Sequence, residues 1–325
     1  MNRMRRAVQF LTAAAAVVVV TGCSGSSSQS DSSTPATPRS TAPAPDLTTT
    51  PATYPVGLAD VAGKPWVVET GSGKVGPLDD LKHAVSVGAT PLRATYDRHL
   101  LWVSVFGAGQ VVAVDPTTGK VVVRSKIGGE PEGIVSAFGH VWVVQQKARR
   151  LAELDNKGKI IRVVATGEEP RQVAASRTAL YVSDFGAGDI YRVDPKTAKV
   201  TSHRHVCDGA QGMAATKYSL WATCTSSDRV VAVNPTTLHR QTSFHVAGEP
   251  DAIHTAGGTV YVALTNGPAL VQLPASGDPV PTLVALQLGD DLPLGDRANV
   301  DLLLIGKRFW VSSPNGGDVI AGSLG

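Results

Sequence analysis

Residues 100–120 read LLWVSVFGAGQVVAVDPTTGK, and this stretch decides the fold. An apolar run opened by Trp102 is followed by a valine-rich run that ends at the turn Asp115-Pro-Thr-Thr-Gly119-Lys. In such a turn the Asx side chain caps the backbone and the proline presets φ. Short runs that are rich in β-branched residues and bounded by turn residues predict antiparallel strands.

The same unit recurs along the chain from Tyr54 to the C-terminus. The aromatic residues that open the apolar run are Trp66, Trp102, Trp142, Tyr181, Trp221, Tyr261 and Trp310, with gaps of 36, 40, 39, 40, 40 and 49 residues. Thirteen positions after each aromatic residue come Asp79, Asp115, Asp155, Asp194, Asn234, Pro274 and Ser323. One supersecondary unit of about 40 residues therefore occurs seven times.

Each unit contains four strand-like runs, as in residues 133–138, 141–145, 150–154 and 159–166. No helical periodicity separates these runs, so they match the blade of a propeller. The sequence therefore predicts an all-β fold, a seven-bladed β-propeller of four-stranded antiparallel blades. The aromatic residue of each unit is expected to pack as a wedge between neighbouring blades.

The two ends of the repeat region complement each other. The seventh unit ends at Gly325 after its third strand, whereas residues 49–56 precede the first inner strand at 57–61 as a surplus. We expect this N-terminal segment to act as the missing fourth strand and to close the ring. Pro51 and Pro55 are tolerable there because the strand is an edge strand.

The N-terminus has the layout of an export signal. Arg3, Arg5 and Arg6 precede a short apolar run, which is followed by the tetrad Val20-Thr21-Gly22-Cys23. The tetrad resembles the bacterial lipobox, and this resemblance implies cleavage before Cys23 and lipidation of its thiol. An ordinary cleavage site beside a lone cysteine is the alternative. We predict a signal peptide at 1–22 and a membrane lipid anchor at Cys23.

A polar segment follows the predicted anchor. Of the 30 residues at 24–53, 25 are Ser, Thr, Pro, Ala or Gly, too few of them apolar to offset the entropy of ordering. We expect residues 23–53 to be a tether and residues 54–325 to be the propeller. Such a tether has an end-to-end distance of roughly 30 Å.

Removal of the signal peptide changes the charge balance. The chain has 30 Lys and Arg and 27 Asp and Glu, and three of the arginines lie within residues 1–22. The mature chain is formally neutral, so the basic bias expected of a nucleic-acid-binding protein is absent. We therefore expect no nucleic-acid partner.

Two cysteines remain in the exported chain, Cys207 and Cys224. Cys207 ends an outer strand and Cys224 lies three residues after Trp221 on the second strand of the next blade, with both strands running toward one face. A disulfide is expected in an oxidising compartment. His203 and His205 near Cys207 also match a short zinc pattern, but the disulfide is the favoured interpretation.

The pattern of the blades, with Tyr181-Val-Ser-Asp184 as its clearest example, resembles the YVTN-type propellers of bacterial cell surfaces, which are close to NHL-repeat proteins. This resemblance implies the propeller fold and roles in binding, scaffolding or catalysis. Streptogramin lyases are similar seven-bladed propellers whose second strands carry Trp-Phe-Thr-Glu. Here that glutamate survives only as Glu69, which argues against their activity.

The connections sort the charges onto two faces. Blade-to-blade loops carry an acidic set and lie on one face, the acidic face: Glu130, Glu132, Glu168, Glu169, Asp208, Glu249, Asp251, Asp290 and Asp291. Arg171 is the basic exception there. The opposite turns carry a basic set, which defines the basic face: Arg98, Lys120, Lys157, Lys159, Lys196, Lys199, Lys217, Arg240, Lys307 and Arg308. This face is net basic despite Asp115, Asp155 and Asp194. Ordinary charged turns would explain the number of charges but not their segregation.

Five polar residues are predicted to meet at the mouth of the channel on the acidic face. Glu132, Arg171 and Asp251 each follow a loop proline, and Gln211 and, approximately, Asn299 align with them. Convergent polar groups over a concave opening predict a binding site. The acidic excess favours a basic protein segment or a divalent cation as ligand.

The sequence thus predicts a membrane-anchored extracytoplasmic protein, monomeric, that binds an envelope protein or a small ligand without a cofactor. Common catalytic motifs are absent. The alternative is a streptogramin-lyase-like lyase or hydrolase that uses a divalent cation at the mouth, with His254 as the candidate catalytic residue. A packed core histidine is the other interpretation of His254.

Overall fold

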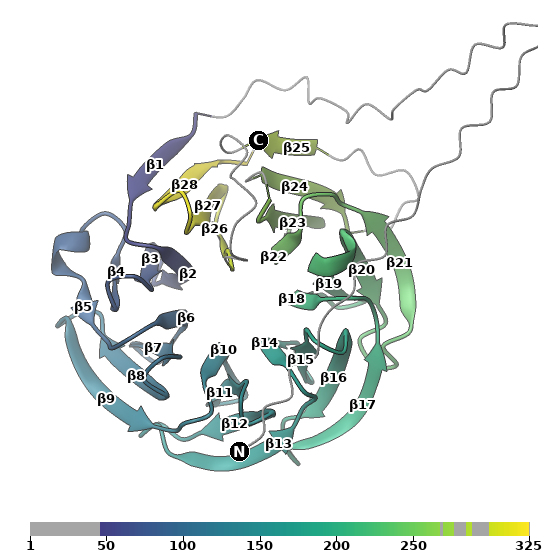
Figure 1. Ribbon diagram of the computed structural model, residues 1–325, viewed down its shortest axis with the longest axis horizontal. Helices are drawn as coiled ribbons and strands as arrows, with labels where there is room; N and C mark the ends of the chain where they lie inside the picture. Colours follow the sequence, from purple (N-terminus) through teal and green to yellow (C-terminus); the bar gives the residue numbers. More distant parts are fainter. Residues whose placement is uncertain (1–45, 267–268, 276–283, 288–298, 325) are drawn as a thin grey trace, which may run out of the picture. The chain divides into compact units, whose positions relative to one another are not determined.

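The computed structural model describes residues 46–266, 269–275, 284–287 and 299–324. In this part of the chain, seven four-stranded antiparallel sheets stand around a central channel (Figure 1). The predicted all-β, seven-bladed propeller is confirmed. The predicted signal peptide and Cys23 lie outside the described residues, as do Asp290 and Asp291. Within the described residues no helix is long and apolar enough to cross a membrane.

The blades follow one another in chain order, and each runs from an inner to an outer strand. Blades 1 and 2 comprise β2 (Pro55–Val61), β3 (Lys64–Glu69), β4 (Lys74–Pro77), β5 (Val85–Ser86), β6 (Pro91–Asp97), β7 (Leu100–Val105), β8 (Gln110–Asp115) and β9 (Lys120–Lys126). Blades 3 and 4 comprise β10 (Pro131–Ala137), β11 (His140–Gln145), β12 (Arg150–Leu154), β13 (Ile160–Ala165), β14 (Pro170–Ala175), β15 (Leu180–Asp184), β16 (Asp189–Asp194) and β17 (Lys199–His205).

Blades 5 to 7 continue the series. They comprise β18 (Ala210–Ala215), β19 (Leu220–Cys224), β20 (Arg229–Val233), β21 (Arg240–His245), β22 (Pro250–Ala256), β23 (Thr259–Leu264), β24 (Ala269–Pro274), β25 (Val284–Gln287), β26 (Leu302–Ile305), β27 (Arg308–Ser313) and β28 (Asp318–Ser323). The short 3-10 turns η1 (Leu81–His83) and η2 (Thr225–Ser227) lie in blades 1 and 5. The strands predicted for blade 3 agree with β10 to β13 to within two residues.

The ring is closed by β1 (Thr48–Pro51), which pairs antiparallel with β28 as the outer strand of blade 7 (Figure 1). The predicted closing strand is correct in kind but too long, because Pro55 and Val56 belong to the inner strand β2. The left-handed backbone of Tyr54, with φ of 48°, turns the chain between the two strands. The chain therefore enters the ring at Thr48, from the basic face.

The aromatic residues pack between blades as predicted. Trp142 of blade 3 shares a buried cluster with Leu180 and Val182 of blade 4, and Trp221 of blade 5 contacts Val260 of blade 6 in the same way. Each of these wedges removes a large apolar surface from water, and this burial stabilises the ring.

The inner strands begin with an irregular pairing that positions the channel residues. In β10 the register shifts between Pro131 and Ile134, and comparable shifts occur at the start of five other inner strands. Such bulges change the direction of a side chain. We call the residue after each loop proline the first inner position and the next residue the second inner position.

Neighbouring inner strands approach each other closely at these positions. A Cβ atom on Gly133 would lie 2.6 Å from the carbonyl oxygen of Arg171 on the next blade, and Gly212 faces the Asp251 carbonyl in the same way. Hydroxyl groups of the second strands bridge the same gap. The Oγ1 of Thr223 accepts from the Gly212 amide at 2.8 Å and donates to the Asp251 carbonyl at 2.6 Å.

The predicted disulfide is present and joins Cys207, which follows β17, to Cys224 at the end of β19, with a Cα separation of 5.8 Å. It ties blade 4 to blade 5. The disulfide uses the only cysteine of the suggested zinc pattern, and His205 binds the Ala187 carbonyl oxygen instead.

Candidate functional site

The five predicted mouth residues come together at one end of the channel. Glu132, Arg171, Gln211 and Asp251 occupy the first inner positions of blades 3 to 6, and Asn299 precedes the inner strand of blade 7. Glu132 is 1% exposed, Gln211 2% and Asp251 3%, so these polar side chains lie within the channel wall. The prediction that these residues lie close together is confirmed, although they are separated by up to 167 positions in the sequence.

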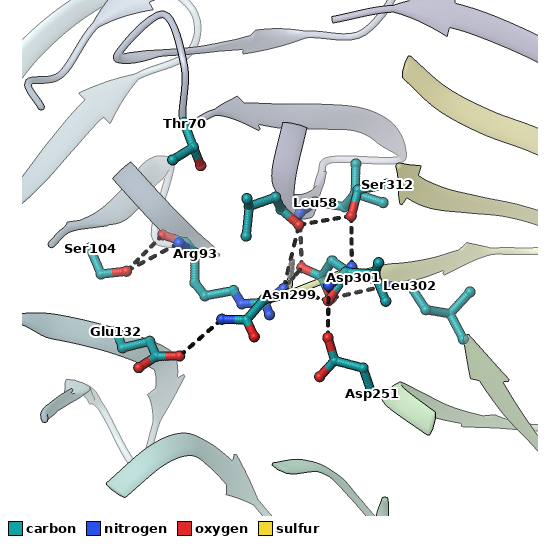
Figure 2. Close-up of polar contacts among 12 residues, drawn as sticks. Leu58, Thr70, Arg93, Ser104, Glu132, Asp251, Asn299, Asp301, Leu302 and Ser312 are labelled. Carbon is teal, nitrogen blue, oxygen red and sulfur yellow. Dashed lines mark hydrogen bonds and ion pairs between the residues drawn. The ribbon is translucent and has the colours of Figure 1, made fainter. Parts of the chain in front are cut away.

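Asn299 lies across the mouth and connects three blades, and Figure 2 shows its contact with Glu132. Its Nδ2 donates to Glu132 Oε1, and its Oδ1 accepts from Gln211 Nε2, each over 3.3 Å. Both bonds are longer than the usual range for N–H···O bonds and are therefore weak. One amide side chain thus spans the mouth without closing it tightly.

Two residues at the centre of the site were not predicted. Arg93 and Asp301 occupy the second inner positions of blades 2 and 7, and the Arg93 Nη1 lies 3.1 Å from Asp301 Oδ2 (Figure 2). Arg93 also donates to the Val300 carbonyl at 3.0 Å. Asp301 accepts from the Leu58 amide at 2.9 Å, so the pair also joins blade 7 to blade 1.

The sequence feature that could have identified this pair is a charged residue within a strand that is expected to be buried. The same position is glycine in three blades, at Gly57, Gly133 and Gly212, where the neighbouring backbone excludes a side chain. Arginine and aspartate on such a strand require partners, because unpaired buried charges are costly. Nothing in the spacing showed that blades 2 and 7 would supply partners for each other.

Burial perturbs two carboxyl groups of the site. It raises the pKa of Glu132 to about 7, although the guanidinium groups of Arg171 and Arg93 act in the opposite direction. Burial also raises the pKa of Asp251 to about 6, against the effects of Arg93 and of the Val300 amide. That amide donates to Asp251 Oδ2 at 2.7 Å. Both carboxyls therefore titrate close to neutral pH.

The arginines of the site are already paired with other carboxylates. Burial alone would lower the pKa of Arg93, but Asp301, Asp251 and Glu132 outweigh it and the pKa is raised. Arg171 forms an ion pair with Glu169, which lies in the loop just before β14. The Nη1 of Arg171 lies 3.8 Å from Glu132 Oε1. Glu132 and Asp251 are thus less fully neutralised than Asp301.

Two cavities adjoin this cluster. The mouth cavity, of about 90 Å³, is lined by Arg171, Phe185, Gln211, Thr225, Glu249, Asp251, Thr265 and Asn299. The channel cavity, of about 200 Å³, is lined by Arg93, Gln172, Asp251 and Asp301 and by an apolar set that includes Leu58, Ile134, Val173, Met213 and Ile253. Asp251 borders both cavities.

His254 does not belong to this cluster. It lies three residues beyond Asp251 on β22 and lines neither cavity, and its Nδ1 has no hydrogen-bond partner among the described residues. Burial lowers its pKa, which favours the neutral ring. The structure supports a packed histidine here.

Glu69 has a structural role in blade 1. Its carboxylate accepts from the Thr53 amide at 2.7 Å and from the Ser72 hydroxyl at 3.0 Å, so it fastens the chain where β1 passes into β2. Among the described residues, no group of three His, Cys, Asp or Glu side chains is arranged to hold a metal ion.

The acidic face is less uniform than the blade-to-blade loops predicted. Glu130 pairs with Lys147 at 3.3 Å, and Glu168 pairs with Arg149 at 3.6 Å. The lysine and the arginine both lie in the loop between β11 and β12, which is not one of the blade-to-blade loops from which the acidic face was predicted. Within the described part of the chain, Asp208 and Glu249 have no lysine or arginine within ion-pair distance.

No family model and no curated protein matches this sequence. Solved structures are similar in fold. The structure of streptogramin B lyase superposes with a TM-score of 0.73 and 15% identity, over 86% of this chain and 97% of the lyase. A catalytically inactive virginiamycin B lyase from Staphylococcus aureus with quinupristin superposes with a TM-score of 0.69 and 16% identity, over 86% and 99%.

BamB from Moraxella catarrhalis is a further neighbour, with a TM-score of 0.59 and 16% identity, over 83% of this chain and 84% of BamB. At such identities the likeness shows the fold alone. It agrees with the seven blades and assigns no activity to the mouth residues.

Proposed function

We propose that this protein is a membrane-anchored extracytoplasmic binding or scaffold protein that recognises a basic segment of an envelope protein through its acidic face. The observation that carries the proposal is the convergence of buried polar residues from blades 3 to 7 at one channel mouth. Loops on a rigid scaffold can carry recognition groups without disturbing the strand pairing. The mouth therefore forms the centre of the proposed contact surface.

The rim supplies the charge for this contact. Asp208 and Glu249 lie on neighbouring loops, and Glu249 lines the mouth cavity. Carboxylates that are not already paired with lysine or arginine can attract and orient a cationic partner. A basic segment that binds here would meet these rim carboxylates first and the buried cluster afterwards.

The anchor and the location rest on the sequence. The lipobox-like tetrad that ends at Cys23 and the YVTN-type pattern support an extracytoplasmic lipoprotein. BamB, a neighbour with a similar propeller fold, shows that this fold occurs in other proteins. Cys23→Ala should release the protein from the membrane fraction, and membrane retention without an acyl label on the wild type would contradict the anchor.

Charge reversal at the rim tests the recognition surface. We expect the Asp208→Lys, Glu249→Lys variant to lose at least tenfold in capture of its envelope partner after detergent extraction, because like charges would then face each other. A Lys217→Glu, Lys307→Glu variant reverses two exposed charges on the basic face and serves as the matched control. Equal capture by the two variants would overturn the proposed surface.

A second candidate function is a lyase of the streptogramin B type. The similarity in fold and the Glu132 carboxyl, which is half-ionised near pH 7 and therefore suited to general-base catalysis, favour it. The protein would then linearise or cleave quinupristin in the presence of a divalent cation. Mass spectrometry of quinupristin after incubation with and without Mg²⁺ decides the point, and the binding proposal predicts no conversion in either case.

A further inference from the structure

Polar groups at the channel cavity and in the wall beside it outnumber the internal hydrogen bonds that they form. Arg93 and Gln172 line the cavity, whereas Glu132 and Gln211 lie buried in the wall beside it. Among the described residues, Gln172 Nε2, Glu132 Oε2, Gln211 Oε1 and Arg93 Nε are buried and have no hydrogen-bond partner. Three of these atoms belong to residues that are more than nine-tenths buried as a whole, namely Glu132, Gln211 and Arg93. Buried polar atoms without partners carry a substantial free-energy cost, so such a cluster points to a ligand.

The charges at the top of the cavity show which kind of ligand fits. Arg93 is neutralised by Asp301 at 3.1 Å, whereas Asp251 has no cation within ion-pair distance among the described residues. Glu132 has only Arg171, whose Nη1 is 3.8 Å away and is shared with Glu169. Two buried carboxyl groups therefore lack full compensation, and a cationic group in the cavity, against the Asp251 carboxylate that lines it, would supply part of it.

The rest of the lining excludes a bare metal ion as the natural occupant. Below the carboxyl groups the wall is formed by apolar side chains from six inner strands, namely Leu58, Ala94, Ile134, Val173, Met213 and Ile253. Apolar surface of this kind gains from contact with an aliphatic body. Gln172 also lines the cavity, and its buried Nε2, which has no hydrogen-bond partner among the described residues, can donate to a carbonyl oxygen.

We infer that the channel cavity binds a small aliphatic ammonium compound that carries a carbonyl group next to the ammonium-bearing carbon, as in an amino acid amide. The ammonium group lies against Asp251, and the Glu132 carboxyl in the wall beside the cavity adds to the negative potential there. The carbonyl oxygen accepts from Gln172, and the aliphatic side chain covers the apolar wall. A cavity of about 200 Å³ suits one such residue. This inference goes beyond the proposed function, because it concerns the channel below Asn299 and needs no protein partner.

Binding should depend on pH in one direction. An ammonium group gains most from ionised carboxylates, and the pKa values of Glu132 and Asp251 lie at about 7 and about 6. The charged groups that face them are Arg93, Arg171, Glu169 and Asp301. Affinity should rise about tenfold from pH 5 to pH 7, with release of protons on binding.

The test is calorimetric titration of the full-length protein with three probes that share a 3-methylbutyl group and differ in the ammonium and carboxamide groups. We expect L-leucinamide to bind, isopentylamine to bind several-fold more weakly because it lacks the carbonyl, and neutral 4-methylpentanamide to bind at least tenfold more weakly. Equal binding of leucinamide and 4-methylpentanamide would overturn the inference. Absence of binding by all three probes would overturn it as well.

Two isosteric variants place the ammonium group. Glu132→Gln and Asp251→Asn retain an oxygen that can accept from Asn299 and Val300, so folding should be preserved, and thermal melting checks this. Asp251→Asn should weaken leucinamide at least tenfold, and Glu132→Gln, outside the cavity lining, by a smaller factor. Glu130→Gln on the rim, where Glu130 pairs with Lys147, should leave binding unchanged. Unchanged binding by both folded channel variants would contradict the inference and would leave the rim capture experiment unaffected.

Discussion

Arg93 is the residue on which the polar cluster depends most. Its guanidinium pairs with Asp301 and donates to the Val300 carbonyl, and its charge lowers the pKa of both Glu132 and Asp251. Breaking a buried ion pair by removing one partner leaves an uncompensated charge, which costs about 3 to 5 kcal/mol.

Arg93→Met should therefore lower the free energy of unfolding by about 3 kcal/mol in urea denaturation, toward the lower end because Asp301 is partly exposed. Adding Asp301→Asn to this variant should recover part of the loss, since the orphaned charge is then gone. If Arg93→Met is as stable as the wild type, Arg93 does not hold the cluster together.

Glu132 makes the stability of the protein depend on pH. Its pKa is raised from 4.5 in the unfolded chain to about 7 in the fold, so the folded state binds the proton more tightly. The associated stability is fully present below pH 4.5 and is lost as pH rises toward 7. By the usual conversion this amounts to on the order of 3 kcal/mol.

Glu132→Gln should remove most of this dependence, because glutamine keeps the hydrogen bond to Asn299 and does not ionise. Urea denaturation at pH 5 and pH 8 should show a smaller loss for the variant than for the wild type, with Glu130→Gln behaving as the wild type. An identical loss in all three proteins would show that the Glu132 carboxyl is not perturbed in this way.

At the scale of the element, the hydroxyl bridges between inner strands explain one part of the repeat. In three of the second strands the residue two positions after the wedge aromatic forms such a bridge, namely Ser183, Thr223 and Ser312. Each hydroxyl donates to the backbone carbonyl oxygen of the first inner position of the next blade. Val68, Val144 and Ala263 occupy the same place in other blades, so the bridge occurs only in some of the ring.

Thr223→Val should lower the free energy of unfolding by about 1 to 3 kcal/mol, because the buried Asp251 carbonyl and the Gly212 amide lose a partner while the shape is kept. Thr201→Val on the outer strand β17, where the hydroxyl is exposed, is the matched control and should change little. Equal effects of the two substitutions in urea would rule out a special role for the bridge.

The same elements show how much of the structure could be predicted from the sequence. Wedge aromatics, valine-rich runs and Asx turns are local signals, and they predicted the blades, the ring and the disulfide correctly. The convergence of Glu132, Arg171, Gln211, Asp251 and Asn299 followed from alignment of the repeats. Arg93 and Asp301 did not, because their pairing depends on the bulges that set the direction of side chains across the closure of the ring.

At the scale of the whole molecule, the basic face has the features of a surface that lies near a membrane. The chain enters the ring from this side, at Thr48 of β1. Two turns on this face expose aromatic side chains, Phe138 and Tyr218, the latter 71% exposed with Lys217 over its ring at 4.9 Å. Aromatic rings and basic side chains together favour the headgroup region of a bilayer.

Protein that lacks the first 23 residues should therefore bind vesicles with anionic lipids more strongly than neutral vesicles at low salt. Attraction is worth about 1 kcal/mol for each well-placed Lys or Arg and falls off within a Debye length. Sedimentation with the two vesicle types measures it, and Lys217→Glu, Lys307→Glu should bind less well. Equal binding of both vesicle types would contradict the orientation.

Photocrosslinking in intact cells tests the central claim most directly, because it examines both faces of the protein at once. Phe185 lines the mouth cavity on the acidic face and Tyr218 lies on the basic face, so p-benzoylphenylalanine at either position keeps an aromatic ring there and adds the crosslinking benzoyl group. The account predicts a defined protein adduct from position 185 and lipid adducts from position 218. A protein partner captured from position 218, with none from position 185, would contradict it.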